Sequence, residues 1–427
     1  METTRALELA VDTAAFLETQ SRGVFWARSA EPDSPIDHTL YHGTAGIIVF
    51  LLELADATGE AAYTDRALAA GRELAQAITK KTWASVAFAT GWPGYAFVFN
   101  ELAKRTDETA FRDASTFCVN RLMAQSTAVG SGIGWIEAMP FSDITGFTGD
   151  REIYDLSVGA GGAALALLGL GHTDHAVAVG KRLLDVGEKT ADGTRWGLMS
   201  DMPFPFTAPN FAHGGAGIGY LLARLFEATG DRTFLDASLD AARYVTSRMT
   251  PVGLGALVCH TEEQQPPEFY FGQCHGPAGT GRLFSLLARI NDDSGHRAAT
   301  TQMLLGMESL GVPETRSWGW WNNHGRCCGD AGLGDAALLF ATNADPAPSG
   351  SLHTLAHRCA SVILDASNQT DDGARSWSQA EHRARPKFVQ RQTGYMQGAA
   401  GIASFLIHLA TATSATPVRI ALPDDIV

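Results

Sequence analysis

The chain has 427 residues, of which 45% are hydrophobic and 18% are charged, and its formal net charge is −14. This composition can bury a large core, which excludes an intrinsically disordered protein. The acidic balance also argues against a general nucleic-acid binder, because such proteins gain much of their affinity by neutralising phosphates with Lys and Arg.

The N-terminal segment METTRALELAVDTAAFLETQ mixes charged and apolar residues. It lacks the basic start and the continuous apolar run of a secretion signal, and no later stretch holds enough consecutive apolar residues to span a bilayer. Six cysteines in a chain of this length are too few for a disulfide scaffold. We therefore expect a cytoplasmic protein without a membrane span, in which clustered cysteines bind metal or take part in catalysis.

A G-x-x-G pattern recurs seven times, and each copy is followed by an apolar run of helical character. Successive copies lie roughly 50 to 70 residues apart, which leaves room for two helices and their loops in each copy. Most of the glycines are interpreted as architectural, since paired glycines allow a tight turn and a close approach of backbones. The pairs are Gly43 and Gly46, Gly91 and Gly94, Gly159 and Gly162, Gly214 and Gly217, Gly276 and Gly279, Gly329 and Gly332, and Gly398 and Gly401.

The segments within and between the copies differ in pattern. The runs GIIVFLLELA from Gly46 and GIGYLLARLFEA from Gly217 are apolar on nearly all sides and predict buried inner helices. Residues 64–78 and 296–310 space their charges by three or four and predict amphipathic outer helices. Neither end of the chain resembles a polar capping repeat. We predict an all-α fold of the α,α-toroid type, a double-layered α/α barrel of about fourteen helices, as a single domain over residues 1–427.

The residue directly before the first glycine of each copy is expected to lie near one end of the fold. Three histidines and one cysteine occupy this position, which predicts a polar, metal-capable cluster. In chain order the residues are His42, Thr90, Val158, His213, His275, Cys328 and Gln397.

Three cysteines stand on these turns, Cys274 in CHGPAG and the adjacent Cys327 and Cys328 in RCCGDAG. Three soft ligands match zinc and leave a fourth position open, which is typical of catalytic zinc sites. Two alternatives remain: three buried free thiols, or a closed structural site with a fourth protein ligand. The candidates for that fourth ligand are His275, His324 and His260.

Other residues near the turns have both a structural and a functional interpretation. His213 in NFAHGGAGIG could cap its helix or act as a general acid or base, since histidine titrates near neutral pH. Asp155 in YDLSVGAGG could cap a helix or orient that histidine. His42 shares the repeat position without a further distinguishing feature, so we interpret it as structural. Trp318, Trp320 and Trp321, just before the cysteine pair, are interpreted as packing residues.

The ordered set of motifs resembles the lanthionine synthetase C-like (LanC-like) cyclase family. It comprises seven G-x-x-G turns, an H-G-x-A-G copy, a C-x-G copy and a C-[HC]-G copy, and it runs from His42 to Ile402. The resemblance implies a double-layered toroid with zinc at one end of its central cavity. It also implies an enzyme that joins a peptide cysteine thiol to a dehydroalanine or dehydrobutyrine and so closes a thioether ring.

The resemblance also implies residue roles. Cys274 and Cys327 correspond to the first two zinc ligands, and Cys328 stands where many members have histidine as the third. His213 corresponds to the catalytic histidine, and Asp155 to the aspartate of the Tyr-Asp motif.

These residues predict a zinc-dependent Michael-type addition. The substrate thiol loses its proton at the open zinc position and attacks the β-carbon of the dehydroamino acid. His213 then protonates the α-carbon, with Asp155 aiding its placement and His275 as a second possible donor. The expected partner is a dehydrated precursor peptide, with a separate dehydratase or kinase/lyase enzyme as a further candidate.

Three other functions agree less well with these motifs than a lanthionine cyclase does. The first is a LanC-like zinc protein that acts as a non-catalytic peptide-binding scaffold. It is suggested by Gln273, which stands where members commonly carry tryptophan, and by Tyr270, which stands near where some members carry arginine. The second is an enzyme that adds a small thiol such as glutathione to dehydroamino acids. The third is another α,α-toroid enzyme, a glycosidase or a zinc prenyltransferase, but no pair of carboxylates suited to a glycosidase stands out at the turns.

Overall fold

The computed structural model describes residues 3–426 apart from 139–141, 143–145, 147, 205, 316–322, 343–345 and 381–384. Trp318, Trp320 and Trp321 lie outside the described residues. The chain separates into two compact units. One comprises Met1–Trp83, Gly94–Cys118 and Trp320–Leu422, and the other comprises Ala84–Pro93, Val119–Gly319 and Pro423–Val427. The single domain predicted over residues 1–427 stays a prediction.

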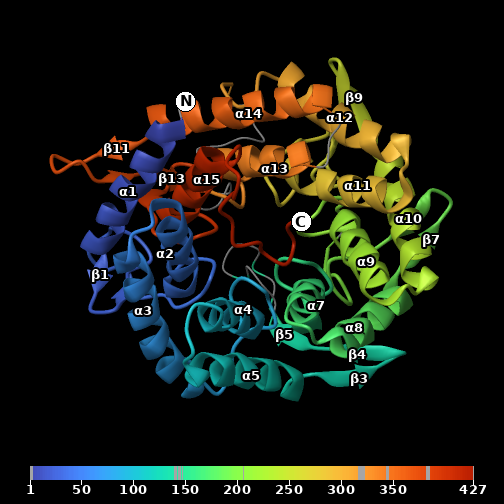
Figure 1. The fold of residues 1–427 in the computed structure, drawn as a ribbon. Coiled ribbons are helices and arrows are strands. Elements are labelled where there is room, and N and C mark those ends of the chain that lie inside the picture. The colour runs from blue at the N-terminus through green and yellow to red at the C-terminus, as the bar shows by residue number, and fades with distance from the viewer. Residues whose placement is uncertain are drawn as a thin grey trace. The chain divides into compact units, whose positions relative to one another are not determined.

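The first unit contains the blue helices and the orange to red helices of Figure 1. These are α1 (Thr3–Thr19), α2 (Thr44–Thr58), α3 (Ala61–Thr79), α13 (Asp330–Thr342), α14 (Pro346–Asp365) and α15 (Ala399–Thr411). Helix α2 packs on α3 and α13 packs on α14, as expected for helical hairpins. The last copy differs, because its buried helix α15 packs on α1 from the N-terminal end of the chain. Two ends of the chain thus complete one helix pair.

The second unit contains three consecutive hairpins, green to yellow in Figure 1. Their helices are α7 (Ala160–Gly169), α8 (Thr173–Val186), α9 (Gly215–Thr229), α10 (Arg232–Ser247), α11 (Pro277–Asn291) and α12 (Ser294–Ser309). Helix α9 packs on both α7 and α11. The boundary between the units passes through α4 (Trp92–Ala103) and α5 (Thr109–Ala124), which complete a set of fourteen helices in the described residues.

The burial of α2 and α3 follows from their sequences. In α2 every residue from 44 to 55 is buried, whereas α3 buries a single stripe at Ala67, Ala70, Gly71, Leu74 and Ile78. Spacings of three and four residues place that stripe on one face of the helix. The predicted division into buried and amphipathic helices is therefore confirmed for this hairpin. None of the helices in the described part of the chain is long and apolar enough to cross a bilayer.

The repeat glycines are required by close contacts in the turns. A Cβ atom built on Gly214 would lie 1.8 Å from the carbonyl oxygen of Ala208, and one on Gly217 would lie 1.9 Å from that of Phe211. In both cases the carbonyl belongs to the residue six positions earlier, so the loop folds back tightly against the start of α9. Any side chain would push this loop away, which confirms the architectural interpretation of these glycines.

Short β-hairpins, which the sequence analysis does not predict, follow several of the amphipathic helices. The described residues contain seven two-stranded antiparallel sheets. Their strands are β1 (Ser21–Arg22) with β2 (Phe25–Trp26), β3 (Thr127–Val129) with β4 (Gly132–Gly134), β5 (Ile136–Ala138) with β6 (Asp150–Glu152), β7 (Glu188–Thr190) with β8 (Gly193–Arg195), β9 (Met249–Val252) with β10 (Gly255–Val258), β11 (Asn368–Gln369) with β12 (Arg375–Ser376), and β13 (Ser378–Ala380) with β14 (Val389–Arg391).

Buried tryptophans connect three of these hairpins to the helices before them. The indole N–H donates to a main-chain carbonyl in the last turn of the helix, a group with no partner inside the helix. The three bonds join Trp135 to Leu122 (2.8 Å), Trp196 to Leu183 (2.7 Å) and Trp377 to Ile363 (2.8 Å). Each hairpin therefore fixes the end of an amphipathic helix.

A buried cluster of charges joins three helices of the first unit. Asp335 on α13 accepts from Arg326 (2.8 Å), Arg419 (2.6 Å) and His408 Nδ1 (2.6 Å). His408 on α15 also contacts Glu53 on α2 through Nε2, at 2.9 Å. Burial alone would raise the pKa of Asp335, but the positive charges of Arg326, Arg419 and His408 outweigh it and hold that pKa well below its ordinary value.

Replacing the central carboxylate is expected to destabilise the protein. Asp335→Asn leaves the side chain of Arg326, which is 1% exposed, without its carboxylate partner. Breaking a buried ion pair costs about 3–5 kcal/mol. The free energy of unfolding, measured with urea at neutral pH, should fall by about this amount.

The pH dependence of the free energy of unfolding is a second test of Asp335→Asn. A carboxyl with a depressed pKa in the folded state contributes stability above its unfolded pKa, and this contribution is lost as the pH falls. The wild-type free energy of unfolding should therefore decline below about pH 4, and that of Asp335→Asn should decline less steeply. Asp56→Asn, which breaks a partly exposed pair with Arg105, is the control and should cost about 0–1 kcal/mol. Equal stabilities of Asp335→Asn and wild type would contradict this role of the cluster.

Candidate functional site

Main-chain hydrogen bonds join the turns that carry the candidate residues. In the second unit, the N–H of Ser157 donates to the carbonyl of Ala212 (3.1 Å), and the N–H of Ala212 donates to that of Cys274 (2.9 Å). In the first unit, Cys327 donates to Met396 (2.8 Å) and Met396 to Tyr41 (3.1 Å) in the same way. Each of these residues stands two positions before the first glycine of its copy. Neighbouring turns of one unit are therefore connected at equivalent positions.

His213 and Asp155 form a hydrogen-bonded pair in the second unit. The distance from His213 Nδ1 to Asp155 Oδ2 is 2.7 Å, and the carboxylate is 1% exposed. Asp155 Oδ1 accepts the main-chain N–H of Val158 at 2.8 Å. Asp155 therefore holds its own turn through Oδ1 and orients the His213 ring through Oδ2. When the Asp155 carboxylate accepts this hydrogen bond, the donated proton lies on Nδ1 of the His213 ring.

His275 lies in a group of aromatic rings with His213. The ring centroids of His213 and His275 are 5.0 Å apart, and those of His260 and His275 are 4.3 Å apart. Tyr270 packs on His260 at 4.4 Å. From the sequence, His260 is predicted only as a candidate metal ligand, and its position beside two other histidines is not predicted.

Asn210 holds the segment that carries His260. It is fully buried, and its side-chain N–H₂ group donates to the carbonyls of Cys259 (2.7 Å) and His260 (3.1 Å). Asn210 is not predicted from the sequence. The only signal available is an asparagine four positions before a repeat glycine, which is too common a feature to single out.

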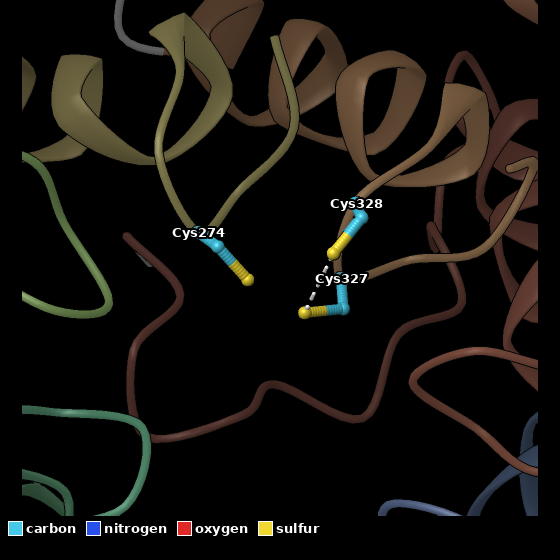
Figure 2. Close-up of side chains that lie close together, drawn as sticks. All are labelled: Cys274, Cys327 and Cys328. Carbon is cyan, nitrogen blue, oxygen red and sulfur yellow. Dashed lines mark hydrogen bonds between the residues drawn. The ribbon is translucent and has the colours of Figure 1, made fainter. Parts of the chain in front are cut away.

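Cys327 and Cys328 face each other on the turn before α13, as Figure 2 shows. Their sulfur atoms are 3.4 Å apart, and no disulfide joins them. A disulfide would require about 2.05 Å, whereas two sulfurs on a tetrahedral zinc ion at 2.3 Å lie about 3.8 Å apart. The Gln397 side chain donates to Cys328 Sγ at 3.4 Å. The spacing and the donated N–H both suit a pair of metal-binding thiolates.

Cys274 stands on the corresponding turn before α11 in the second unit (Figure 2). It is partly exposed, whereas Cys118 and Cys359 are fully buried within helices. Burial raises the pKa of the Cys118 thiol, and it also raises that of Cys259. These thiols stay protonated at neutral pH and make poor metal ligands.

His324 forms a second histidine–carboxylate pair, in the first unit. Its Nδ1 atom lies 2.6 Å from Asp330 Oδ2, and both side chains are buried. His324 is a predicted candidate for the fourth metal ligand, but its pairing with Asp330 is not predicted from the sequence. Asp330 is the first residue of α13, a common place for an acidic side chain, so its pattern gives no further signal.

Comparison with solved protein structures identifies the fold class. A nisin cyclase structure matches with a TM-score of 0.65 at 15% identity, covering 97% of this chain and 95% of that chain. An unsaturated glucuronyl hydrolase specific for heparin matches with a TM-score of 0.52 at 9% identity, covering 96% of both chains. The predicted all-α fold of the α,α-toroid class is thereby confirmed. Since the same fold also occurs in a hydrolase, function has to be argued from the site.

Sequence comparison gives more specific evidence of the protein family than the fold does. A search of curated protein sequences finds no significant match. The profile of the family described as "Lanthionine synthetase C-like protein" matches residues 34–421. The chain belongs to the lanthionine synthetase C-like family.

Proposed function

We propose that this protein is a lanthipeptide cyclase. It adds cysteine thiols of a dehydrated precursor peptide to dehydroalanine or dehydrobutyrine and forms lanthionine or methyllanthionine rings. The family membership supports a cyclase-type fold. The cysteines on two repeat turns and the His213–Asp155 pair supply chemistry that this reaction needs.

Zinc held by Cys274, Cys327 and Cys328 is part of the proposal. Cys274 lies on a repeat turn of the second unit, and Cys327 and Cys328 lie on a repeat turn of the first. Three thiolates are soft donors, which favour zinc over magnesium or calcium. Three protein ligands would leave the fourth tetrahedral position for the substrate.

Zinc held by these cysteines would supply Lewis acidity that lowers the pKa of an incoming thiol, about 8.5 in a free cysteine, so that a thiolate would be available at neutral pH. His213 Nε2 accepts the thiol proton, while the buried Asp155 carboxylate stabilises the resulting imidazolium through Nδ1. The substrate sulfur forms a bond to the β-carbon, and the π electrons of the double bond move toward the carbonyl to give an enolate. His213 Nε2 then donates its proton to the α-carbon. His275, whose ring packs beside that of His213, is the second candidate donor.

One observation supports this assignment most strongly. The hydrogen bond from the Ala212 N–H to the Cys274 carbonyl, at 2.9 Å, joins the turn of the candidate acid to the turn of a candidate ligand. Ala212 directly precedes His213, so proton transfer and thiol binding would occur on adjacent turns. Proximity of this kind is what attack by the thiolate, followed by protonation of the enolate, requires.

The proposed partner is the dehydrated peptide, with a separate dehydratase or kinase/lyase enzyme supplying it. The cysteines of the described residues form no disulfide, which fits the reducing conditions of a cytoplasm. We therefore propose a cytoplasmic location.

Incubation with a peptide that contains both a cysteine and a dehydroamino acid tests the function. Ring closure should leave the peptide mass unchanged but block its alkylation by a thiol reagent, and a chelator should prevent this. Peptide binding without loss of the free thiol would indicate a scaffold instead. A peptide mass increased by glutathione, when glutathione is supplied, would indicate addition of a small thiol.

The metal ligands can be tested by metal analysis. Cys274→Ala, Cys327→Ala and Cys328→Ala should each lower the bound zinc per chain, because each removes one of three proposed donors. Cys328→His should retain zinc, since an imidazole nitrogen is also a zinc ligand. Cys118→Ala, which alters a buried thiol, is the matched control and should retain full zinc content. Full zinc content in all three alanine variants would rule out this ligand set.

The acid–base pair can be tested by kinetics. His213→Asn should slow ring closure by about 100-fold or more, because general acid–base catalysis contributes on the order of 10²–10⁴. Asp155→Asn should also slow it, because an amide can donate to Nδ1 and reverse the tautomer. Both variants should keep their zinc. His42→Asn changes the histidine at the same position of another copy and serves as the control, with a rate near that of wild type. Rates of His213→Asn and wild type within a factor of three would argue against the assignment.

A further inference from the structure

The last described residues of the chain are anchored in the second unit by a buried arginine. Arg282 on α11 is 1% exposed, and its Nη1 donates to the main-chain carbonyl of Asp424 (2.6 Å) and to Asp425 Oδ1 (3.0 Å). The side chain of Asp425 is fully buried. A buried charge pair with these additional bonds holds its segment in one position, since separating it would leave an uncompensated charge.

Helix α9 supplies further contacts to the same segment. The Tyr220 hydroxyl donates to the carbonyl of Asp425 at 3.2 Å, and Arg224 Nη1 donates to it at 3.3 Å. Burial raises the pKa of Tyr220 to about 12, so this hydroxyl keeps its proton and remains a donor at neutral pH. The segment is therefore fixed against two helices, α9 and α11.

This fixed segment contacts the residue that directly precedes Cys274. The side-chain N–H₂ group of Gln273 donates to the Asp424 carboxylate, and Gln273 is 6% exposed. The carbonyl of Gln273 lies so close to α11 that a Cβ on Gly279 would be 1.8 Å from it. On the other side, the Cys274 carbonyl accepts from Ala212. The backbone that carries Cys274 is thus held both before and after its Cα atom.

We propose that Gln273 and Asp424 form a positioning pair that orders the Cys274 turn and thereby raises its affinity for metal. The proposal rests on the zinc site proposed above. Neither residue is a ligand or an acid–base group in the reaction. Residues that orient metal ligands through hydrogen bonds typically contribute 10- to 100-fold to metal affinity.

An exchange of the two functional groups tests the pair. Gln273→Glu places a second carboxylate opposite Asp424 and removes the donor. Combining it with Asp424→Asn restores one amide and one carboxylate with their roles reversed, and it leaves the net charge as in wild type. Gln302→Glu, an exposed glutamine on α12, is the control for an added negative charge in the same unit.

Zinc affinity is measured by competition with a chromophoric chelator, and thermal unfolding is recorded for every variant. We expect Gln273→Glu to bind zinc roughly 10- to 100-fold more weakly. The double variant should recover to within a few-fold of wild type, and Gln302→Glu should match wild type. Unchanged affinity of Gln273→Glu, or a double variant no tighter than Gln273→Glu, would overturn the proposal. A loss of affinity that follows only the loss of thermal stability would also overturn it.

Hydrogen exchange of the metal-free protein separates this proposal from the proposed function. Backbone amides of residues 273–279 should exchange faster in Gln273→Glu than in wild type, and the double variant should restore their protection. A wild-type protein that binds no zinc but shows this exchange pattern would refute the zinc site while the ordering of the turn by the pair stands. Identical exchange in all variants would refute the positioning pair even if the wild type binds zinc.

Discussion

The close contact between a repeat glycine and the carbonyl six residues before it is the constraint on which the turns depend. At Gly214 and Gly217 this contact leaves no room for a Cβ atom. The loop can therefore fold back and place the residues just before the helix in a fixed position. Because the same contact recurs in other copies, as at Gly46 with Leu40 and Gly401 with Tyr395, one local rule positions several candidate side chains. The glycines have no chemistry of their own, but the placement of the cysteines and histidines follows from them.

The sequence predicts the features that are local or repeated. The apolar runs after the glycines are buried helices, and the spacing of the cysteines on the turns separates them from Cys118 and Cys359 inside helices. His213 and Asp155 lie 2.7 Å apart, and their catalytic roles stay predictions. The buried helices could be predicted because periodicity and turn geometry act over a few residues.

Long-range pairings could not be predicted in the same way. Helix α15 packs on α1 although the two are separated by most of the chain, and no local pattern encodes that choice. The ionic cluster of Asp335 joins side chains from three helices, and each of its members looks like an ordinary charged residue in sequence. The hairpin strands are only two to four residues long, which is too short for a period-two pattern to be recognised. All three features depend on packing in the folded protein and not on a local sequence pattern.

The main-chain bonds between turns have a consequence for how such a protein can change. Ala212 and Cys274 are linked through an N–H and a carbonyl, atoms that every residue but proline possesses, and so are Cys327 and Met396. The side chains at these positions therefore take no part in the hydrogen bonds that connect the turns. Alanine, serine, methionine, tyrosine and cysteine all occupy them within this one chain. Reactive side chains can therefore be substituted at these positions one at a time during evolution. The chemistry of the site can change in this way while the fold is kept.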